Sequence, residues 1–322
     1  MKLIIQIPCF NEEQTLPTTL ADLPREVPGF EVVEWLVVDD GSTDRTAEVA
    51  REHGVDHVVR HTHNHGLARA FMTGIDFGLK AGAHVIVNTD ADNQYRGADI
   101  PRLVGPILAN LADIVVGARP IDSVEHFSSL KKLLQKLGSG VVRLASGTDI
   151  ADAPSGFRAI GREAAMRTLV FNPYTYTLET IIQAGRNDMR ILSVPIGVNR
   201  DLRPSRLVKS IPSYVKRSVL TILRIFVLYK PMRFFGGTGL VSALIGTMIG
   251  VRFVLYWSMG NGSGHIQSLI LAAILIILGS VLVLMGFVCD LIAANRRLLE
   301  DIRYRELSRE MASVQRERSY VS

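Results

Sequence analysis

Cysteine is scarce in this sequence, with Cys9 and Cys289 as the only two among 322 residues. Both lie in apolar segments far apart in the chain, so they do not indicate the disulfide framework of a small secreted domain. No charged segment followed by an apolar one precedes the strand-like run at 3–8, and we expect no cleavable signal peptide. These absences favour a protein that faces the reducing cytosol.

The sequence also lacks internal repeats, low-complexity tracts and a strong excess of charge of one sign. Its 36 basic and 31 acidic residues give a net charge of +5, which is compatible with anionic partners. Hydrophobic residues make up 48% of the chain. A chain of this length and composition can form one sizeable domain with an extension.

Two long apolar segments, 234–257 and 266–289, differ from the rest of the chain. As a helix, each would measure roughly 36 Å, against about 30 Å for the hydrocarbon core of a membrane. The second segment has no charged residue, and the first has only Arg252, near an end where its side chain can reach the headgroups. We therefore predict a transmembrane hairpin; the alternative is a pair of buried helices in a soluble protein.

Basic residues flank this hairpin on both sides. They are Arg203, Arg206, Lys209, Lys216, Arg217, Arg224, Lys230 and Arg233 before it, and Arg296, Arg297, Arg303 and Arg305 after it. The positive-inside rule then places both termini in the cytoplasm. Between 205 and 229, apolar residues recur at helical spacing among the basic ones. This pattern predicts one amphipathic helix, or two broken near Pro212, on an anionic membrane surface.

Short apolar runs alternate with amphipathic segments through the first 200 residues. This order is typical of a mostly parallel α/β sheet, in which ligands bind beyond the carboxyl ends of the strands. The predicted strands cover 3–8, 34–40, 56–61, 83–90 and 113–119, and the predicted helices cover 45–53, 67–82 and 98–110. Further along, the predicted elements are helices at 127–146 and 176–185, a loop and short strand within 152–160, and a strand at 190–199.

Two carboxylates, Asp90 and Asp92, stand where the predicted strand at 83–90 ends. Such charges repel each other unless a cation lies near them, and Mg²⁺ is commonly shared between one or two carboxylates and a substrate diphosphate. Asp92 and Gln94 point the same way in an extended loop and can bind the metal, which leaves Asp90 to meet the sugar or ribose. A solvated turn with helix-capping acids is the alternative.

Other predicted strand ends carry further polar groups. In PCFNEE, Phe10 can stack on a nucleobase and Glu12 can accept a hydrogen bond from it. In DDGSTD, Asp39 or Asp40 can accept from a base or a ribose hydroxyl. The residues expected to cap the following helix are Ser42, Thr43 and Asp44. These groups all converge on one edge of the predicted sheet, which is where an active site is expected.

Three further features have two interpretations each. Arg119 can neutralise a diphosphate or form a surface ion pair. The histidines of HTHNH (61–65) suggest zinc, but no Cys or carboxylate set completes such a site, and a loop is favoured. Glu179 is the one candidate general base, or an ordinary acid on a helix surface. A phosphate acceptor is already anionic and needs positioning rather than a base, which suits the many basic residues near the hairpin.

Together these segments resemble the family 2 glycosyltransferases with the GT-A fold, a Rossmann-like α/β fold with a mostly parallel sheet. Within that family they are most similar to the polyprenyl-phosphate branch typified by dolichol-phosphate mannose synthase. The matching segments are IPCFNEE, VVDDGSTDRT, NHGLARA, NTDADNQY, VVGAR, SGFRAI and RPSRL, followed by the hairpin. The family often has Tyr at the position of Phe10, and its acids are commonly followed by Leu and a Pro-containing turn rather than by Asn93 and Tyr95.

The resemblance implies inverting transfer of a monosaccharide from a UDP- or GDP-linked sugar to a polyprenyl (undecaprenyl or dolichyl) phosphate, with Mg²⁺ or Mn²⁺ as cofactor. It also implies roles by position. These are Pro8, Phe10, Glu12, Asp39, Asp40 and Asp90 for the nucleotide, Asp92 and Gln94 for the metal, Asp90, Asp92, Arg119 and Arg203 for catalysis, and Arg203 and Arg206 for the acceptor phosphate. The position of Arg69 implies no role.

The expected organisation is a catalytic domain at 1–200, basic interface helices at 201–233, a hairpin at 234–290 and a charged cytoplasmic tail at 291–322. The expected partners are the nucleotide sugar, the polyprenyl phosphate and the membrane, but no nucleic acid. A homo-oligomer is possible on the sequence. One alternative is transfer to another lipid or a polysaccharide, which the lack of a Q-x-x-R-W-type motif disfavours. The other is a non-catalytic scaffold or flippase partner, which the intact acids disfavour.

Overall fold

The computed structural model describes residues 1–120, 140, 143, 147–170, 176–199, 220, 227, 231–260 and 263–321. The chain divides into two compact units, Met1–Val215 together with Glu300–Ser322, and Lys216–Leu299. Apart from a few single positions, the helices expected at 127–146 and 205–229 lie outside the described residues. Arg203 and Arg206 lie outside them as well.

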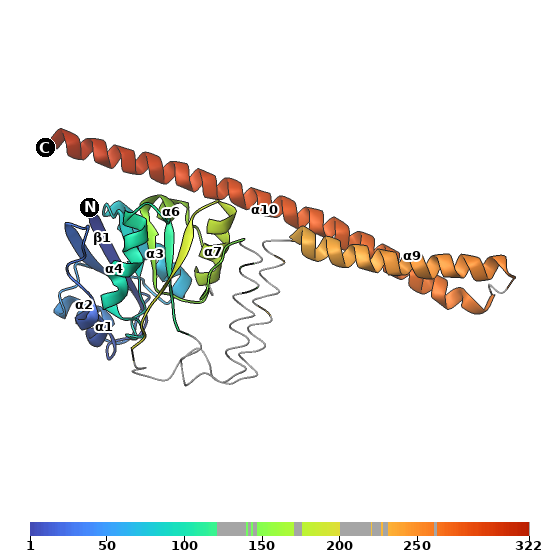
Figure 1. The fold of residues 1–322 in the computed structure, drawn as a ribbon, viewed down its shortest axis with the longest axis horizontal. Helices are drawn as coiled ribbons and strands as arrows, with labels where there is room; N and C mark the ends of the chain where they lie inside the picture. Colours follow the sequence, from blue (N-terminus) through green and yellow to red (C-terminus); the bar gives the residue numbers. More distant parts are fainter. Residues whose placement is uncertain are drawn as a thin grey trace. The chain divides into compact units, whose positions relative to one another are not determined.

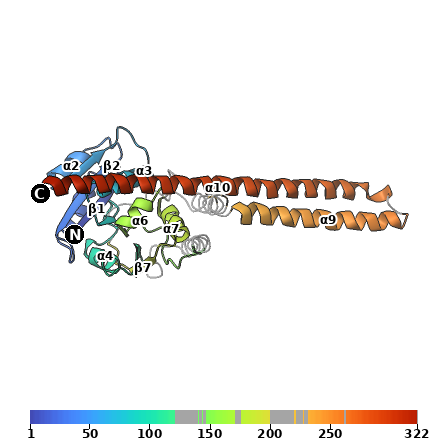
Figure 2. The ribbon, with the colours of Figure 1, turned by 90° about the horizontal axis from the view of Figure 1, so that it is seen from above.

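A seven-stranded mixed sheet forms the centre of the first unit (Figure 1). Its strands are β1 Lys2–Cys9, β2 Val32–Asp39, β3 His57–Arg60, β4 Val85–Asn88, β5 Ile114–Ala118, β6 Arg158–Gly161 and β7 Ile191–Pro195. The order is β3-β2-β1-β4-β6-β5-β7, and β2 and β7 lie toward opposite ends of the sheet in Figure 2. Because β6 alone among these strands runs antiparallel to its neighbours, the expectation of a mostly parallel α/β sheet is confirmed.

Helices cover both faces of this sheet, as alternating side chains along β1 require. On one face, Leu3, Ile5 and Ile7 belong to the same buried cluster as residues of three helices. These helices are α1 Leu16–Asp22, α2 Thr46–Glu52 and α4 Ile100–Leu108, the last preceded by the 3-10 turn η1 Gly97–Asp99. The opposite face carries α3 Leu67–Lys80, α6 Arg162–Arg167 and α7 Tyr176–Arg186.

Helix α3 approaches the sheet closely because two glycines lie one turn apart on its inner face. A Cβ at Gly74 would lie 2.2 Å from Oε1 of Gln6, and a Cβ at Gly78 would lie 2.8 Å from Cδ1 of Ile86. Positions four residues apart share a helix face, so both glycines meet the sheet together. This contact places the beginning of α3 at the carboxyl edge of the strands.

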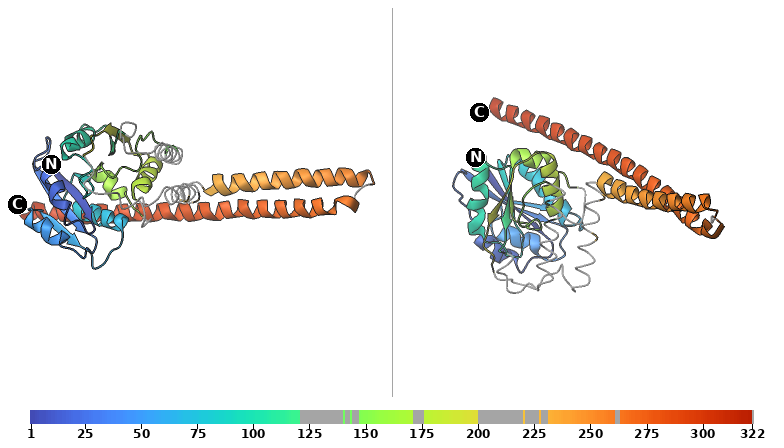
Figure 3. Two further views of the ribbon diagram at one scale, coloured as in Figure 1. Left: turned by 90° about the horizontal axis from the view of Figure 1, so that it is seen from below. Right: turned by 45° about the vertical axis from the view of Figure 1, so that its right-hand side comes forward.

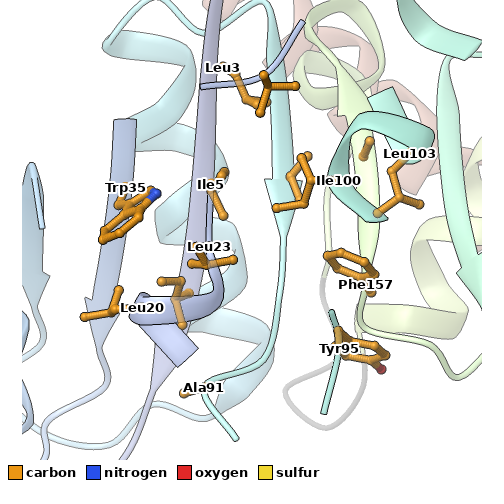
Figure 4. Packing of buried hydrophobic residues seen from close by; sticks show 14 of the residues in the cluster. Leu3, Ile5, Leu20, Leu23, Trp35, Ala91, Tyr95, Ile100, Leu103 and Phe157 are labelled. Atoms are coloured by element: carbon orange, nitrogen blue, oxygen red, sulfur yellow. The ribbon is translucent and has the colours of Figure 1, made fainter. Parts of the chain in front are cut away.

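The buried core on the α1 and α4 face extends to the loop that follows β4. Figure 4 shows Leu20 and Trp35 beside Ile5, and Tyr95 stacked on Phe157 at the lower end. The two ring centroids are 5.0 Å apart with planes 12° apart. Fully burying a side chain of this size stabilises the fold by about 1.5–3 kcal/mol. Asp92 therefore stands on a loop with both ends buried, since Ala91 and Tyr95 on either side of it are each only 4% exposed.

The C-terminal part of α10 (Ile266–Val321) belongs to the first unit from Glu300 onward and packs on α3 and α6. Arg303 forms an ion pair with Asp76 of α3. The hydroxyl of Tyr304 donates a hydrogen bond to Glu163 of α6 at 2.7 Å, and Leu307 is buried nearby in the sequence. This stretch lies within the segment expected to be a charged tail.

The second unit consists mainly of α9 (Gly237–Ser258) and the first part of α10, which lie side by side in both views of Figure 3. A Cβ at Gly239 would lie 2.6 Å from the carbonyl oxygen of Gly279, and the converse distance is also 2.6 Å. Most large apolar side chains of this pair point outward, among them Leu244 and Leu284. Both helices are long and apolar enough to cross a membrane, and the orientation of the hairpin remains a prediction.

Two short helices, α1 and α6, were not expected from the sequence. They span only seven and six residues, too few for the periodicity of apolar residues to stand out. The strand that we expected within 152–160 is β6. It lies between β4 and β5 and runs antiparallel to both. This insertion brings the segment before β6 to the edge where β4 ends.

Candidate active site

Asp40, at the end of β2, holds the loop that follows β3. Its Oδ1 accepts hydrogen bonds from Nδ1 of His61 at 2.7 Å and from the backbone N–H of His65 at 2.9 Å. Its Oδ2 accepts from the backbone N–H of Gly66 at 2.7 Å. Both carboxylate oxygens are thus used within the protein. The HTHNH segment is a loop fixed by a neighbouring acid, and Asp40 has a structural role in it.

Asp39 differs from Asp40 in its hydrogen bonds. Its side chain is only 1% exposed. Its Oδ1 accepts a hydrogen bond from the backbone N–H of Ser42 at 2.9 Å. Its Oδ2 lies 3.1 Å from Nε of Arg60, yet makes no well-aligned hydrogen bond within the described part of the chain. A buried carboxylate oxygen favours a hydrogen-bonded partner. Of the two acids, Asp39 is therefore the one whose carboxylate has capacity for a further donor, at an oxygen that is buried in this structure.

The loops after β1 and β2 are joined to each other by side chains. The backbone N–H of Asn11 donates to Oγ of Ser42 at 2.9 Å, and the backbone N–H of Thr43 donates to Oδ1 of Asn11 at 2.9 Å. Asn11 has a φ of 55°, a left-handed conformation that asparagine tolerates better than most residues. The expectation that Ser42 and Thr43 cap α2 is wrong, because these residues bind the neighbouring loop instead.

Asp44 does bind the start of α2, as expected. Its Oδ1 accepts from the backbone N–H of Thr46 at 3.0 Å, and its Oδ2 accepts from the backbone N–H of Glu13 at 3.2 Å. Burial alone would raise the pKa of Asp44, but a hydrogen bond from the hydroxyl of Thr46, together with these two backbone hydrogen bonds, lowers it below its ordinary value. Asp44 therefore links α2 to the first loop as a carboxylate.

The three residues expected at the nucleotide from the first loop have different environments. Pro8 is buried inside β1, and the side chain of Phe10 just beyond the strand is 39% exposed. Glu12 is buried, and its Oε2 accepts a hydrogen bond from Oγ1 of Thr15 at 2.6 Å. Phe10 thus presents an aromatic surface at the sheet edge, while Pro8 and Glu12 support the loop that carries it.

Asp90 lies against the backbone of Gly156, in the segment that precedes β6. A Cβ at Gly156 would lie 2.9 Å from both carboxylate oxygens of Asp90 and 2.9 Å from the hydroxyl oxygen of Tyr176. Although part of Asp90 reaches solvent, burial by the surrounding protein and the charge of Asp92 raise its pKa to about 7. Arg119 and Arg158 act in the opposite direction. A cation bound nearby would favour the ionised form of Asp90.

Asp92 and Gln94 lie on a turn stabilised by backbone contacts. Oδ1 of Asp92 accepts from the backbone N–H of Gln94 at 3.2 Å, and Asn93 between them has a φ of 54°. The carbonyl of Gln94 accepts from the backbone N–H of Asn199 at 2.9 Å. The side chains of Asp92 and Gln94 both keep partial exposure to solvent. The turn therefore leaves these two oxygen-bearing side chains accessible.

Arg119, at the end of β5, forms a bidentate ion pair with the fully buried Asp152. Its Nε lies 2.7 Å from Oδ2 and its Nη2 lies 3.1 Å from Oδ1 of that residue. Its Nη1 faces Oε1 of Gln94 at 3.5 Å. The ion pair is more buried than the expected surface pair, since the Arg119 side chain is only 15% exposed. Its outer nitrogen points toward the candidate site, where a phosphate would meet it.

A buried polar network beneath Asp90 was missed by sequence reasoning. Nε2 of Gln6 donates to Oδ1 of Asn88 at 2.8 Å, and Nδ2 of Asn88 donates to the carbonyl of Gly156 and the hydroxyl of Tyr176, each at 2.9 Å. Arg158 is fully buried and donates to the carbonyl of Thr177 at 3.0 Å. Polar residues inside apolar strands, such as Gln6 in LIIQIP, were the available signal.

Glu179 does not lie on the surface of its helix, as one interpretation expected. It is 3% exposed on α7, among other buried residues of that helix. A buried acid of this kind contributes to the interior of the domain. Its assignment as a general base stays a hypothesis.

The acids after β4 suit a hard divalent cation, because Asp90, Asp92 and Gln94 offer oxygen ligands. Among the described residues, no group of three or more His, Cys, Asp or Glu side chains can hold a metal ion. A cation here would therefore take its remaining ligands from a substrate and from water. Mg²⁺ commonly binds in this way, through one or two carboxylates and substrate phosphates.

The mixed α/β sheet and its acidic carboxyl edge define a GT-A-like glycosyltransferase fold. Residues 4–169 match the model of glycosyl transferase family 2, and the chain belongs to this family. It is 31% identical over 219 residues to an undecaprenyl-phosphate mannosyltransferase of Micrococcus luteus, covering 64% of this chain and 88% of that one. It is 29% identical over 216 residues to a polyprenol monophosphomannose synthase of Mycolicibacterium smegmatis, covering 63% and 80%. The resemblance inferred from the motifs is thus confirmed.

Among solved structures, the fold is similar to that of glucosyl-3-phosphoglycerate synthase from Mycobacterium tuberculosis, in complex with Mn²⁺, UDP and glucosyl-3-phosphoglycerate. The TM-score is 0.55 with 22% sequence identity, and the match covers 70% of this chain and 78% of that chain. At this identity the similarity concerns the fold alone. The GT-A architecture expected from the sequence is confirmed by it.

Proposed function

We propose that this protein transfers a monosaccharide from a nucleoside-diphosphate sugar to a polyprenyl phosphate at the cytoplasmic face of a membrane. One observation carries the proposal above all. A family 2 glycosyltransferase domain with an acidic sheet edge shares its chain with two helices long and apolar enough to cross a membrane. The relatives named for transfer to undecaprenyl phosphate and polyprenol phosphate support the same acceptor class.

The donor would lie across the carboxyl ends of β1, β2 and β4. Phe10 offers a stacking surface for the base, and Oδ2 of Asp39, which is buried and makes no well-aligned hydrogen bond, would accept from a base N–H or a ribose hydroxyl. Asp92 and Gln94 would hold Mg²⁺ or Mn²⁺, and Asp90 would contact the donor beside them. When bound, the metal supplies positive charge that stabilises the departing diphosphate.

The acceptor would need positioning and charge compensation rather than deprotonation. A phosphate monoester is anionic at neutral pH, so its oxygen can attack the sugar without a general base. The outer nitrogen of Arg119 can balance charge on the donor side, while Asp152 holds the guanidinium in one orientation. Arg203 and Arg206, which lie outside the described residues, are proposed to bind the lipid phosphate.

The division into a catalytic domain (1–200), interface helices (201–233), hairpin (234–290) and cytoplasmic tail (291–322) belongs to this proposal. So does the cytoplasmic location of both termini, which rests on the basic residues flanking the hairpin. A reporter fused after Ser322 should read as cytoplasmic in whole cells. A signal from the opposite side of the membrane would contradict this topology.

The deciding experiment supplies purified full-length protein with Mn²⁺, polyprenyl phosphate and a panel of UDP- and GDP-linked sugars. Mass spectrometry should detect one polyprenyl-phosphate monosaccharide, formed from one donor and lost in chelator. A product on another lipid or on a polysaccharide would replace the proposed acceptor. Donor binding without turnover on any acceptor would favour a non-catalytic scaffold. The same panel identifies the sugar and the nucleotide.

A further inference from the structure

The loop at 91–97, which carries both proposed metal ligands and which we term the metal loop, is fixed near its two ends by α1. The hydroxyl group of Thr19 donates to the carbonyl of Ala91 at 2.9 Å. Oδ2 of Asp22, the last residue of α1, accepts from the backbone N–H of Gly97 at 2.8 Å. These two contacts hold the ends of the loop, and the stretch between them needs support from another part of the chain.

The segment that follows β7 supports the middle of the metal loop. Val198 forms an isolated antiparallel bridge with Tyr95. The next residue, Asn199, donates through its backbone N–H to the carbonyl of Gln94 at 2.9 Å. These backbone contacts bring the side chain of Asn199 to the point where the metal loop meets the end of α1.

The side-chain amide of Asn199 lies among three oxygen atoms. Its Nδ2 is 3.4 Å from each of them: Oδ1 of Asn93, the carbonyl oxygen of Tyr95 and Oδ2 of Asp22. Three acceptors around one position require the NH₂ end of the amide there, since the other end has no hydrogen to donate. Two hydrogens shared among three oxygens make long hydrogen bonds, and together these bonds join the metal loop to the end of α1.

The side-chain amide and the backbone N–H of Asn199 together contact three consecutive residues, 93–95, of the metal loop. Asn93 stands between the two proposed ligands with a φ of 54°, so its conformation sets how Asp92 and Gln94 are directed relative to each other. We propose that Asn199 is a positioning residue, whose side-chain amide holds this turn so that Asp92 and Gln94 can share the metal ion of the donor. This inference rests on the proposed function.

Asn199→Asp tests the donor role of the amide, because asparagine and aspartate have nearly the same shape and an ionised aspartate donates no hydrogen bond. The variant places an oxygen where the amide nitrogen stands, among three acceptor oxygens that include the carboxylate of Asp22. Repulsion between these oxygens should loosen the metal loop from α1. The backbone N–H of residue 199 keeps its hydrogen bond to the loop, so the fold should remain.

Asn110→Asp is the matched control, because the side chain of Asn110 acts as an acceptor. Its Oδ1 accepts from Nη2 of Arg190 at 3.0 Å, a role that a carboxylate keeps. Asn110 lies between α4 and β5, at the amino end of β5 and therefore at the opposite edge of the sheet from the metal loop. The same substitution is thus made once where the amide donates and once where it accepts.

Hydrogen exchange of the metal-free full-length proteins measures the contact itself, on peptides that cover 91–97. We expect exchange about fivefold faster in Asn199→Asp than in the wild type, because the loop opens more often when its side-chain hydrogen bonds are lost. In Asn110→Asp this loop should exchange as it does in the wild type. Unchanged exchange at 91–97 in Asn199→Asp would overturn the inference.

Calorimetry of UDP and of GDP, each with Mn²⁺ and in EDTA, measures the consequence for the ligand. We expect Asn199→Asp to bind the preferred nucleotide about tenfold more weakly than the wild type in Mn²⁺, and equally tightly in EDTA. Asn110→Asp should match the wild type under both conditions. Wild-type affinity of Asn199→Asp in Mn²⁺ would contradict the inference. Equal losses with and without metal would also contradict it, because they indicate a general structural role.

Asn199→Ala provides a second test, which also decides the matter if Asn199→Asp does not fold. It removes the amide without adding an oxygen, so metal-dependent binding should fall less than in Asn199→Asp, by about threefold. Wild-type binding in Asn199→Ala would contradict the inference. A loss larger than that of Asn199→Asp would do the same, because it would show that the volume of the side chain matters rather than its donor.

The proposed function and this inference fail in different ways. If the wild type binds neither UDP nor GDP more tightly with Mn²⁺ than in EDTA, the proposed function is wrong. If the wild type shows that dependence and both Asn199 variants keep it in full, only the role of Asn199 is wrong.

Discussion

Two pairs of acids stand at the ends of neighbouring parts of the sheet, and the protein uses them differently. In the first pair, Asp40 gives both of its oxygens to the loop at 61–66, and Asp39 keeps one oxygen without a well-aligned hydrogen bond. In the second pair, Asp90 lies against Gly156 and Asp92 stays partly exposed. In the first pair the two acids therefore differ in role: Asp40 holds a neighbouring loop, and Asp39 has capacity for a further donor. In the second pair, both acids are proposed to face the donor and its metal.

The comparison predicts that acids with several protein hydrogen bonds contribute mainly to the stability of the fold. Acids with an oxygen that lacks such bonds are expected to contribute mainly to nucleotide binding. A carboxylate that accepts several protein hydrogen bonds stabilises the fold, and removing it leaves buried donors unsatisfied. A carboxylate oxygen without a well-aligned hydrogen bond, such as Oδ2 of Asp39 beside Arg60, has capacity for a further donor. Variants of each pair separate the two roles.

The largest effect is expected for Asp92→Ala. It removes an anionic metal ligand, and we expect sugar transfer to fall by roughly 100- to 1,000-fold, with metal-dependent nucleotide binding lost. Product formation and calorimetry in the same preparation measure both quantities. Asp149→Ala is the matched control, because the side chain of Asp149 is 95% exposed. Full activity of Asp92→Ala, or of the wild type in chelator, would show that the metal site is assigned wrongly.

Asp40→Asn should reduce stability more than any other conservative change in the first pair. An amide group cannot accept from His61, His65 and Gly66 together, so at least one buried donor loses its partner. We expect a loss of about 2 kcal/mol in the free energy of unfolding, measured by denaturant titration. A variant with wild-type stability and impaired nucleotide binding would instead place Asp40 at the ligand.

Asp39→Asn should show the opposite pattern. The amide oxygen can still accept from Ser42, so most of the stability should remain. Loss of the second carboxylate oxygen should weaken nucleotide binding about tenfold, or about 1.4 kcal/mol. Asp40→Asn is the natural comparison, and calorimetry and denaturation of both variants test the division. Equal losses of stability in Asp39→Asn and Asp40→Asn would contradict the assignment of different roles to these two acids.

The smallest effect is expected for Arg119→Lys at the second pair. A lysine keeps the charge but cannot form the two-pronged contact with Asp152. We expect a loss of about 1 kcal/mol in the free energy of unfolding, and a modest reduction in donor affinity. Asp92 should respond far more strongly than Arg119 to the same assay of product formation. A larger loss of turnover in Arg119→Lys would show that its guanidinium group contacts the reacting phosphates.

The sequence predicted the parts of the site that lie on single strand ends. Apolar runs revealed β1 to β5, and the acids after them were visible as breaks in those runs. Residue contacts across long separations were not visible, such as Arg119 with Asp152 or Asn88 with Tyr176. These pairs meet because β6 enters the sheet antiparallel between β4 and β5. Local patterns of hydrophobicity carry no information about that insertion.

The nucleotide loops show the same limit at shorter range. Ser42 and Thr43 have the side chains of typical helix caps, and only the neighbouring Asn11 explains why they bind elsewhere. The role of Asp40 was equally hidden, because its partners lie on the loop after another strand. Residue type thus predicted that these side chains form hydrogen bonds, while the topology of the sheet determines which group each one binds.

The contact of the C-terminal segment with α3 and α6 has an evolutionary consequence. Arg303 pairs with Asp76 and Tyr304 pairs with Glu163, although the members of these pairs are 227 and 141 positions apart in the sequence. A change at one member therefore removes the partner of the other. Among relatives that keep this segment, positions 76 and 303, and positions 163 and 304, should change together, with reversed charges tolerated at the first pair.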